Sequence, residues 1–157
     1  MEDLENEEPE ELFILALDVD TRTEKSLIRD AMKNVWETFK MIIEATSKNK
    51  KLEDLYGLII KKCFDFCKKY NRRTEFKKLC ELIRFQLNSI IRSLMNNPDY
   101  SKIPFAIDLT NLETNEKQIM IRFDQLEYIY EFELWQEAIK TLEDIHHIMQ
   151  KRRAHVK

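Results

Sequence analysis

The sequence predicts an all-α protein, built as a right-handed stack of antiparallel helical hairpins like those of helical-repeat solenoids. Charged residues make up 35% of the 157 residues, and the single glycine and three prolines leave few tight turns, which favours long amphipathic helices. One helical pattern of apolar residues also occurs twice, which is typical of a solenoid, a fold that presents surface rather than carrying out chemistry. The two copies are Phe76, Leu79, Cys80 and Ile83, then Trp135, Ala138, Ile139 and Leu142.

Three helices are expected in the first part of the chain, after an acidic leader. Residues 1–9 are predicted to be disordered because they are acidic and poor in apolar residues, which leaves 10–157 as the helical-repeat domain. Pro9 fits the start of a short helix, and the polar residues 18–21 predict a break after it. The second and third helices are expected over 23–46 and 49–70, and Gly57 predicts a close helix crossing. Their predicted inward residues are Leu27, Ile28, Val35, Trp36, Phe39, Ile42 and Ile43, then Leu52, Leu55, Ile59, Cys63, Phe66 and Cys67.

The remaining three helices are expected over 74–96, 112–131 and 133–152, which makes six in all. Turn residues at 96–99 end the fourth helix, and the segment 100–108 should be extended because the residue before Pro104 avoids the α region. Thr110 and Glu113 predict a capping box at the start of the fifth helix. The predicted structural core consists of Trp36, Phe76, Leu79, Ile83, Phe123, Trp135, Ala138, Ile139 and Leu142.

The net charge of −3 conceals segments of alternating sign. Residues 1–24 carry a net charge of −9, residues 48–78 carry +7 and residues 79–147 carry −6. Such alternation is typical of a protein with several partners. No apolar run approaches the ~20 residues of a membrane span, and three cysteines form no disulfide framework, which fits a reducing cytosol or nucleus. Of the two compartments, the cytoplasm is the one expected.

Two clusters are candidates for chemical sites. Cys63 and Cys67 share one helix face, but a zinc site needs about four ligands, so buried core cysteines are the preferred interpretation. Glu143, His146 and His147 share another face, but no second carboxylate–histidine pair completes a metal site. The predictions are therefore no enzyme activity, no catalytic or metal-binding residues, no cofactor and no small-molecule substrate.

A basic turn is the best candidate for a functional surface. Its cations could contact phosphates and Tyr70 could stack on a base, which would make the turn an RNA or partner contact. The alternative is a solvated turn whose cations favour a helix C-terminus. The candidate contact residues are Lys68, Lys69, Tyr70, Arg72, Arg73, Lys77 and Lys78.

Several motifs, in collinear order over about residues 10–146, resemble the largest subunit of eukaryotic translation initiation factor three. The Trp-Gln-Glu-Ala run at 135–138 is the most specific of them. The resemblance rests on Val35–Glu37, Phe64–Tyr70, Glu75–Cys80, Ala106–Leu109, Glu133–Ala138 and Glu143–His146.

The resemblance implies a helical-repeat segment that precedes a winged-helix PCI module, within a longer protein. It further implies a non-catalytic scaffold that supports assembly of the factor, pairs with the second large PCI subunit and contacts rRNA or proteins of the small ribosomal subunit. Two alternatives stay open. One is an RNA-contacting module acting through residues 68–78, and the other is a scaffold of another PCI complex, such as the proteasome lid or the signalosome.

Overall fold

The structure is a computed structural model that describes the backbone of residues 9–153 and the side chains of residues 21–152. The chain divides into two compact units, Met1–Thr38 and Phe39–Lys157. The described part contains five α-helices and two short 3-10 helices and no strand, which confirms the all-α prediction. The predicted leader lies outside the described residues except for Pro9. In order the elements are α1 (Pro9–Thr46), η1 (Lys50–Leu52), α2 (Glu53–Lys69), α3 (Arg73–Asn96), η2 (Tyr100–Lys102), α4 (Leu112–Glu131) and α5 (Trp135–Arg153).

Helix α1 runs through the predicted break at residues 18–21, so the expectation of six helices was wrong by one. Polar residues lower helix propensity only slightly, and neither Pro nor Gly interrupts this segment. Trp36 is buried as predicted, whereas Leu27, Ile28 and Val35 are exposed. The apolar pattern therefore marks a wider face of α1 than the one that is buried.

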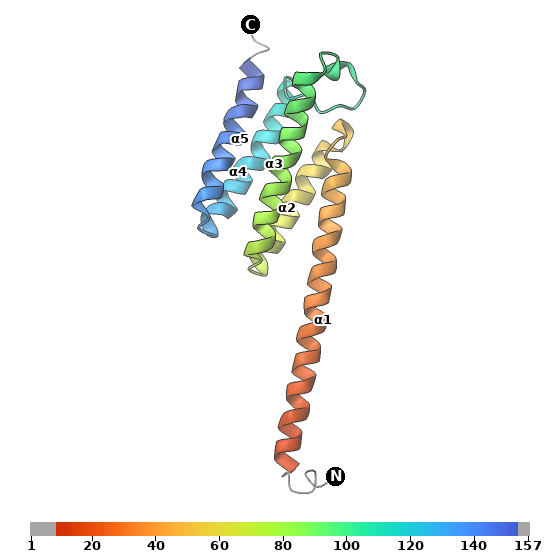
Figure 1. Cartoon of the computed structure of the whole chain (residues 1–157), viewed down its shortest axis with the longest axis vertical. Coiled ribbons are helices and arrows are strands. Elements are labelled where there is room, and N and C mark those ends of the chain that lie inside the picture. Colours follow the sequence, from red (N-terminus) through yellow and green to blue (C-terminus); the bar gives the residue numbers. More distant parts are fainter. Residues whose placement is uncertain (1–8, 154–157) are drawn as a thin grey trace. The chain divides into compact units, whose positions relative to one another are not determined.

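The second unit is built from two antiparallel hairpins, α2–α3 and α4–α5. Helix α2 contacts α3 and α4, and α5 contacts α3 and α4, so helices in corresponding positions of the two hairpins lie side by side (Figure 1). This is the stacking that defines a helical-repeat fold.

The two hairpins share one turn geometry, 62 positions apart. Asn71 and Glu133 both have positive φ, at 51° and 56°. In each turn the next amide bonds to the carbonyl five residues back, Arg72 to Cys67 at 2.7 Å and Leu134 to Ile129 at 3.0 Å. This pair of turns sets the register of the repeat.

That register differs by three residues from the predicted one, which pairs Phe76 with Trp135. The turns instead pair Phe76 with Ala138, and α5 is rotated accordingly. As a result Trp135, Ile139 and Leu142 are 57%, 61% and 54% exposed, and Ala138 is half-buried. Their prediction as core residues was wrong, while Phe76, Leu79 and Ile83 are buried as expected.

Most of the side chains that helix α4 buries are polar. Phe123, a predicted core residue, is 53% exposed, and Tyr130 is 70% exposed. The face that is buried is rotated from the predicted face by about the angle between successive helix residues, so that Arg122 points inward in place of Phe123. Most of its members are polar groups. Its members are Thr114, Asn115, Gln118, Ile121, Arg122, Gln125 and Ile129.

The core has an aromatic part and an aliphatic part. Phe76 lies between Phe64 and Phe132, with ring centroids 5.6 Å and 4.9 Å apart, and so joins the two hairpins. The segment between α3 and α4 contributes Ile107 and Leu109 to an aliphatic cluster with Ile148 of α5. This segment opens with η2, so the prediction that it is extended throughout was wrong.

The start of α4 is capped by Asn111 rather than Thr110. The Asn111 side chain accepts the amide of Thr114 at 3.2 Å, and Thr110 instead donates its hydroxyl to Asp108. The predicted capping box is therefore not formed, because Thr114 donates its hydroxyl to Glu53 and the Asn111 amide bonds to the carbonyl of Asp108. A single Asn cap takes its place, one residue later.

Candidate interaction surfaces

Helix α5 presents an exposed apolar ridge, which we define as Trp135, Ile139, Leu142 and Met149. The spacings of four, three and seven residues place these side chains on one face of the helix. All four are at least 43% exposed. Tyr130 at the end of α4 extends the ridge, since its ring meets Trp135 edge-on with centroids 5.9 Å apart. Ile139 and Leu142 also line a shallow hollow of about 340 Å³.

The opposite face of α5 is held to α3 by ion pairs. Arg84 of α3 lies 3.3 Å from a carboxylate oxygen of Glu137 and 3.1 Å from one of Asp144. Both acids are buried. Burial raises the pKa of Asp144, and Arg84 opposes this by lowering it. These bonds fix the rotation of α5 and so turn the ridge outward.

A buried arginine lies on the inward face of α4 and is hydrogen-bonded within that helix. Arg122 is 1% exposed, and it donates to the carbonyl and the side-chain oxygen of Gln118 at 3.0 and 2.6 Å. Burial lowers its pKa. Next to it Tyr56 donates to Gln86, and burial raises the pKa of Tyr56 to about 12 while Arg122 lowers it. A guanidinium needs polar neighbours when it is buried, so this layer specifies which face of α4 points inward.

The repeat shows what two of the four ridge positions do in the first hairpin, while Trp135 and Ile139 correspond to exposed Arg73 and Lys77. Leu142 and Met149 of α5 correspond to Cys80 and Leu87 of α3, which are 0% and 1% exposed. Leu87 is covered in part by Ile148 of α5, in the second hairpin. The corresponding positions of α5 are uncovered in this chain.

The sequence does carry a signal for this outward ridge. The polar residues of α4 recur at helical spacing, and so do the buried Glu137, Thr141 and Asp144 of α5. Apolar residues are usually buried, which is why the apolar pattern alone predicts the opposite rotation. The competing polar pattern is the one that the fold follows.

The predicted basic turn joins α2 to α3 and is exposed apart from half-buried Arg72. Lys68 pairs with Glu131 at 2.8 Å, which raises the pKa of Lys68, and Arg72 pairs with Glu75 at 3.6 Å. Lys69 lies over the ring of Tyr70, 5.4 Å from its centroid. Within the described residues no ion pair involves Lys69, Arg73, Lys77 or Lys78.

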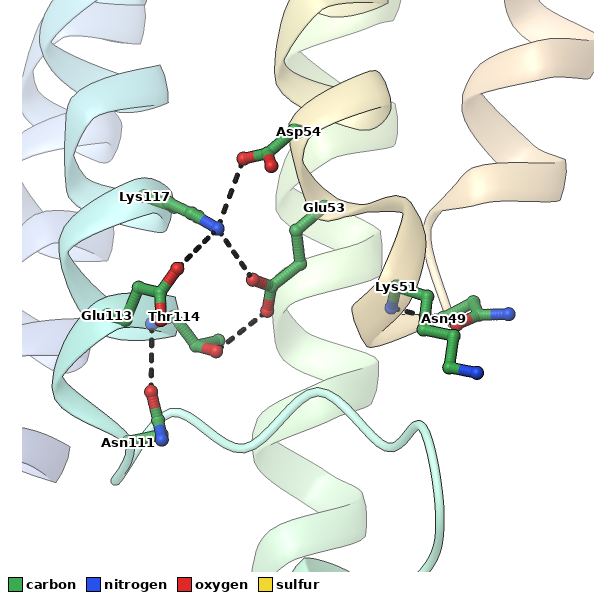
Figure 2. Close-up of polar contacts among 8 residues, drawn as sticks. All are labelled: Asn49, Lys51, Glu53, Asp54, Asn111, Glu113, Thr114 and Lys117. Atoms are coloured by element: carbon green, nitrogen blue, oxygen red, sulfur yellow. Dashed lines mark hydrogen bonds and ion pairs between the residues drawn. The ribbon is translucent and has the colours of Figure 1, made fainter.

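A polar cluster joins the starts of α2 and α4 (Figure 2). Lys117 of α4 points toward three carboxylates, Glu53 at 3.5 Å, Asp54 at 3.1 Å and Glu113 at 2.9 Å, and the carboxylates raise its pKa. Buried Thr114 donates to the other oxygen of Glu53 at 2.7 Å. Every charge in this cluster has an opposite neighbour, so we assign it to the packing of α2 against α4.

The two candidate chemical clusters lie in different surroundings. Cys63 and Cys67 are buried as predicted. The pKa of Cys67 is raised, mainly by a side-chain hydrogen bond with Cys63 and secondly by burial. Glu143, His146 and His147 lie on the surface of α5, where His146 contacts Gln150. In the described part of the chain, no group of three or more His, Cys, Asp or Glu side chains is placed to hold a metal ion.

None of the helices in the described part of the chain is both long and apolar enough to span a membrane. Two helical hairpins that stack side by side define a helical-repeat protein. The chain belongs to the eIF3a family, because a family model described as "eIF3a, PCI domain, TPR-like region" matches residues 2–157.

Curated relatives agree with this family. The protein named as the A subunit of eukaryotic translation initiation factor 3 in Schizosaccharomyces pombe is 36% identical over 153 residues, which are 95% of this chain and 16% of the relative. The protein of the same name in Yarrowia lipolytica is 34% identical over 152 residues, 94% of this chain and 16% of the relative. In Emericella nidulans the identity is 36% over 153 residues, 95% of this chain and 14% of the relative. The chain thus spans about a sixth of the length of these relatives.

Proposed function

We propose that this chain is a non-catalytic scaffold segment of eukaryotic translation initiation factor 3, acting in the cytoplasm. The ridge on α5 carries the proposal, because large apolar side chains in a continuous exposed row are typical of a surface that another macromolecule covers. The relatives are named as part of this factor, which favours it over the proteasome lid and the signalosome. The expected partners are other subunits of the factor, especially the second large PCI subunit, and the small ribosomal subunit.

The repeat indicates the kind of element that covers the ridge. In the first hairpin the positions equivalent to Leu142 and Met149 are buried under helical neighbours. The part of the ridge formed by Leu142 and Met149 therefore suits a further helix that packs at the same spacing. The row of four apolar side chains as a whole resembles the helix-in-groove mode of recognition.

Charge introduced into the ridge tests this proposal. Ile139→Glu with Leu142→Glu should reduce the recovery of other factor 3 subunits in co-purification by about tenfold or more, since buried apolar anchors dominate such interfaces. Both residues are more than half exposed, so the free chain should unfold at nearly the same temperature as before.

The matched control is Leu58→Glu in α2, set against the single change Leu142→Glu. Leu58 is 53% exposed against 54% for Leu142, so the two changes cost the free chain similar amounts. Full recovery of the subunits with the ridge variant, or equal loss with both variants, would argue against the ridge as the assembly surface.

RNA contact through the basic turn is a second candidate function. It is favoured by the exposed cations Lys69, Arg73, Lys77 and Lys78, which take part in no ion pair within the described residues. Exposed Tyr70 beside them offers a ring on which a base can stack.

The turn contains cations with an acidic partner and cations without one among the described residues, and comparing the two kinds gives a matched test. Lys69→Gln with Arg73→Gln should weaken binding of single-stranded RNA and reduce the slope of log affinity against log salt by about 0.7 per lost phosphate contact. Lys68→Gln with Arg72→Gln should have the smaller effect, because both cations already have acidic partners. Equal effects of the two double variants, or none from either, would contradict this assignment.

A further inference from the structure

A groove lies between α3, the turn before α2 and the segment that connects α3 to α4. Its volume is about 480 Å³. One face of α3 forms one wall, and the other wall comes from the connecting segment and from residues 47–49. The lining residues of α3 are Phe85, Gln86, Ser89, Ile90 and Ser93, and those of the connecting segment are Tyr100, Ile103, Pro104, Phe105 and Ala106.

Apolar side chains stand exposed at the groove although nothing in the described fold requires them there. Phe85 is 69% exposed, Phe105 is 50% exposed and Ile103 is 47% exposed. Two polar groups of the lining are already bonded within the domain, since Ser93 donates to the carbonyl of Ser89 and Gln86 accepts the Tyr56 hydroxyl. The groove therefore offers a place for an apolar side chain and few directed contacts for a polar small molecule.

Phe105 is held at the groove in a conformation that aromatic residues rarely adopt. Its φ is 68°, in the left-handed region, which glycine adopts easily and a residue with a bulky side chain adopts only under strain. Its carbonyl accepts the amide of Lys50 at 2.8 Å, and the ammonium of Lys51 lies 4.3 Å from the centre of its ring. Strained residues that the surroundings hold in place concentrate at binding sites.

The edge of the groove is basic. Lys48 lines it, Lys50 and Lys51 follow at once, and Lys50 and Lys51 are exposed. Within the described residues none of the three forms an ion pair. An occupant with acidic groups beside its apolar anchor would complement this edge.

We infer that this groove is a docking site for a short acidic peptide segment of a partner protein, which inserts one bulky apolar side chain between Phe85 and Phe105. The lysines at the edge meet the flanking carboxylates. A peptide fits better than a nucleic acid because Ile90, Ile103, Pro104 and Ala106 offer apolar contacts, whereas a strand of RNA brings polar sugar and phosphate. This site is separate from the ridge and from the basic turn, so it stands independently of the proposed function.

Titration of the isotopically labelled full chain with short synthetic peptides, followed by NMR, tests the inference. The probe has one tryptophan flanked by aspartates, and two companion peptides replace either the tryptophan with alanine or the aspartates with asparagines. Amide shifts should cluster at residues 47–51, 85–93 and 100–106, and both companions should bind about tenfold more weakly.

Phe85→Glu should abolish these shifts, whereas Met95→Glu should leave them unchanged. Both residues belong to α3 and are 69% and 70% exposed, but only Phe85 lines the groove, so the pair is matched for charge and for its effect on folding. The inference is overturned if the groove amides do not respond to the acidic peptide, if the two variants behave alike, or if an RNA oligonucleotide shifts those amides and the peptide does not.

Discussion

At the scale of single residues, buried polar groups determine which faces of α4 and α5 point inward. Arg122 is enclosed by the polar layer, and Arg84 holds two carboxylates of α5. Removing one member of a buried charged pair leaves its partner uncompensated at a cost of about 3–5 kcal/mol, whereas leaving one apolar side chain exposed costs about 1.5–3 kcal/mol. This difference explains why the outward position of Trp135 and Ile139 is tolerated.

Asp144 gives this layer a defined dependence on pH. Burial raises its pKa in the folded chain above the ordinary value of 3.8, although Arg84 pulls it down. Between pH 3.8 and the folded-state pKa, Asp144 keeps its proton in the folded chain and loses it in the unfolded chain. The stability contributed by Asp144 is therefore fully present below pH 3.8 and is lost as the pH rises through its folded-state pKa.

Urea unfolding of the wild type and of Asp144→Asn across acidic pH checks this sign. The free energy of unfolding of the wild type, minus that of the variant, should decrease as the pH rises from below 3.8. Asp99→Asn, at an exposed position, serves to correct for the loss of one charge elsewhere. A difference that grows with pH would mean that the attraction of Arg84 outweighs burial.

At the scale of elements, the sequence predicts the helices well and their rotations less well. The boundaries expected at 74–96 and 112–131 differ from α3 and α4 by at most one residue, because turn residues and caps mark them locally. The predicted register of the repeat is displaced by three residues. The prediction paired Trp135 with Phe76 because both are aromatic, but Trp135 lies three residues closer to its turn than Phe76 does. A local pattern fixes the ends of a helix, whereas the buried face depends on partners distant in sequence.

The same distinction applies to the candidate sites. The basic turn could be predicted because it is a run of adjacent charges on one loop. The groove beside Phe85 and Phe105 could not, because it forms only when three separate segments of the chain come together. The apolar pattern of the ridge alone predicts a core, and only the competing polar pattern at Glu137, Thr141 and Asp144 indicates that the ridge faces outward.

The packing of α2 on α4 supplies a prediction about Gly57, where the sequence indicates a close helix crossing. A methyl group at this position would meet the side chain of Ile121 at 3.9 Å, which is ordinary contact. Gly57→Ala should therefore stabilise the chain by up to about 1 kcal/mol, since alanine favours the helix and fits the space.

Thermal or urea unfolding measures this change, and Asn88→Ala on the exposed surface of α3 provides a comparison that depends on helix propensity alone. A loss of stability on Gly57→Ala would show that α2 and α4 lie closer together than the structure has them.

At the scale of the whole molecule, the exposed features of the described residues support the proposed scaffold role. Its cysteines are buried, and its histidines on α5 belong to no metal cluster among the described residues. The exposed features are an apolar ridge, a basic turn and a groove with a basic edge, on different elements. Separate surfaces for separate partners are what a scaffold within a large assembly requires, and they agree with membership of the eIF3a family.

Hydroxyl-radical footprinting of the chain, free and assembled with the other subunits of factor 3, shows whether the ridge is covered in the complex. Trp135 and Met149 of the ridge are 57% and 43% exposed, and Met95 of α3, 70% exposed, is the reference. We expect oxidation of Trp135 and Met149 to fall several-fold on assembly while that of Met95 is unchanged. Oxidation of Trp135 and Met149 at the same rate in the assembled factor as in the free chain would contradict the role of the ridge as an assembly surface.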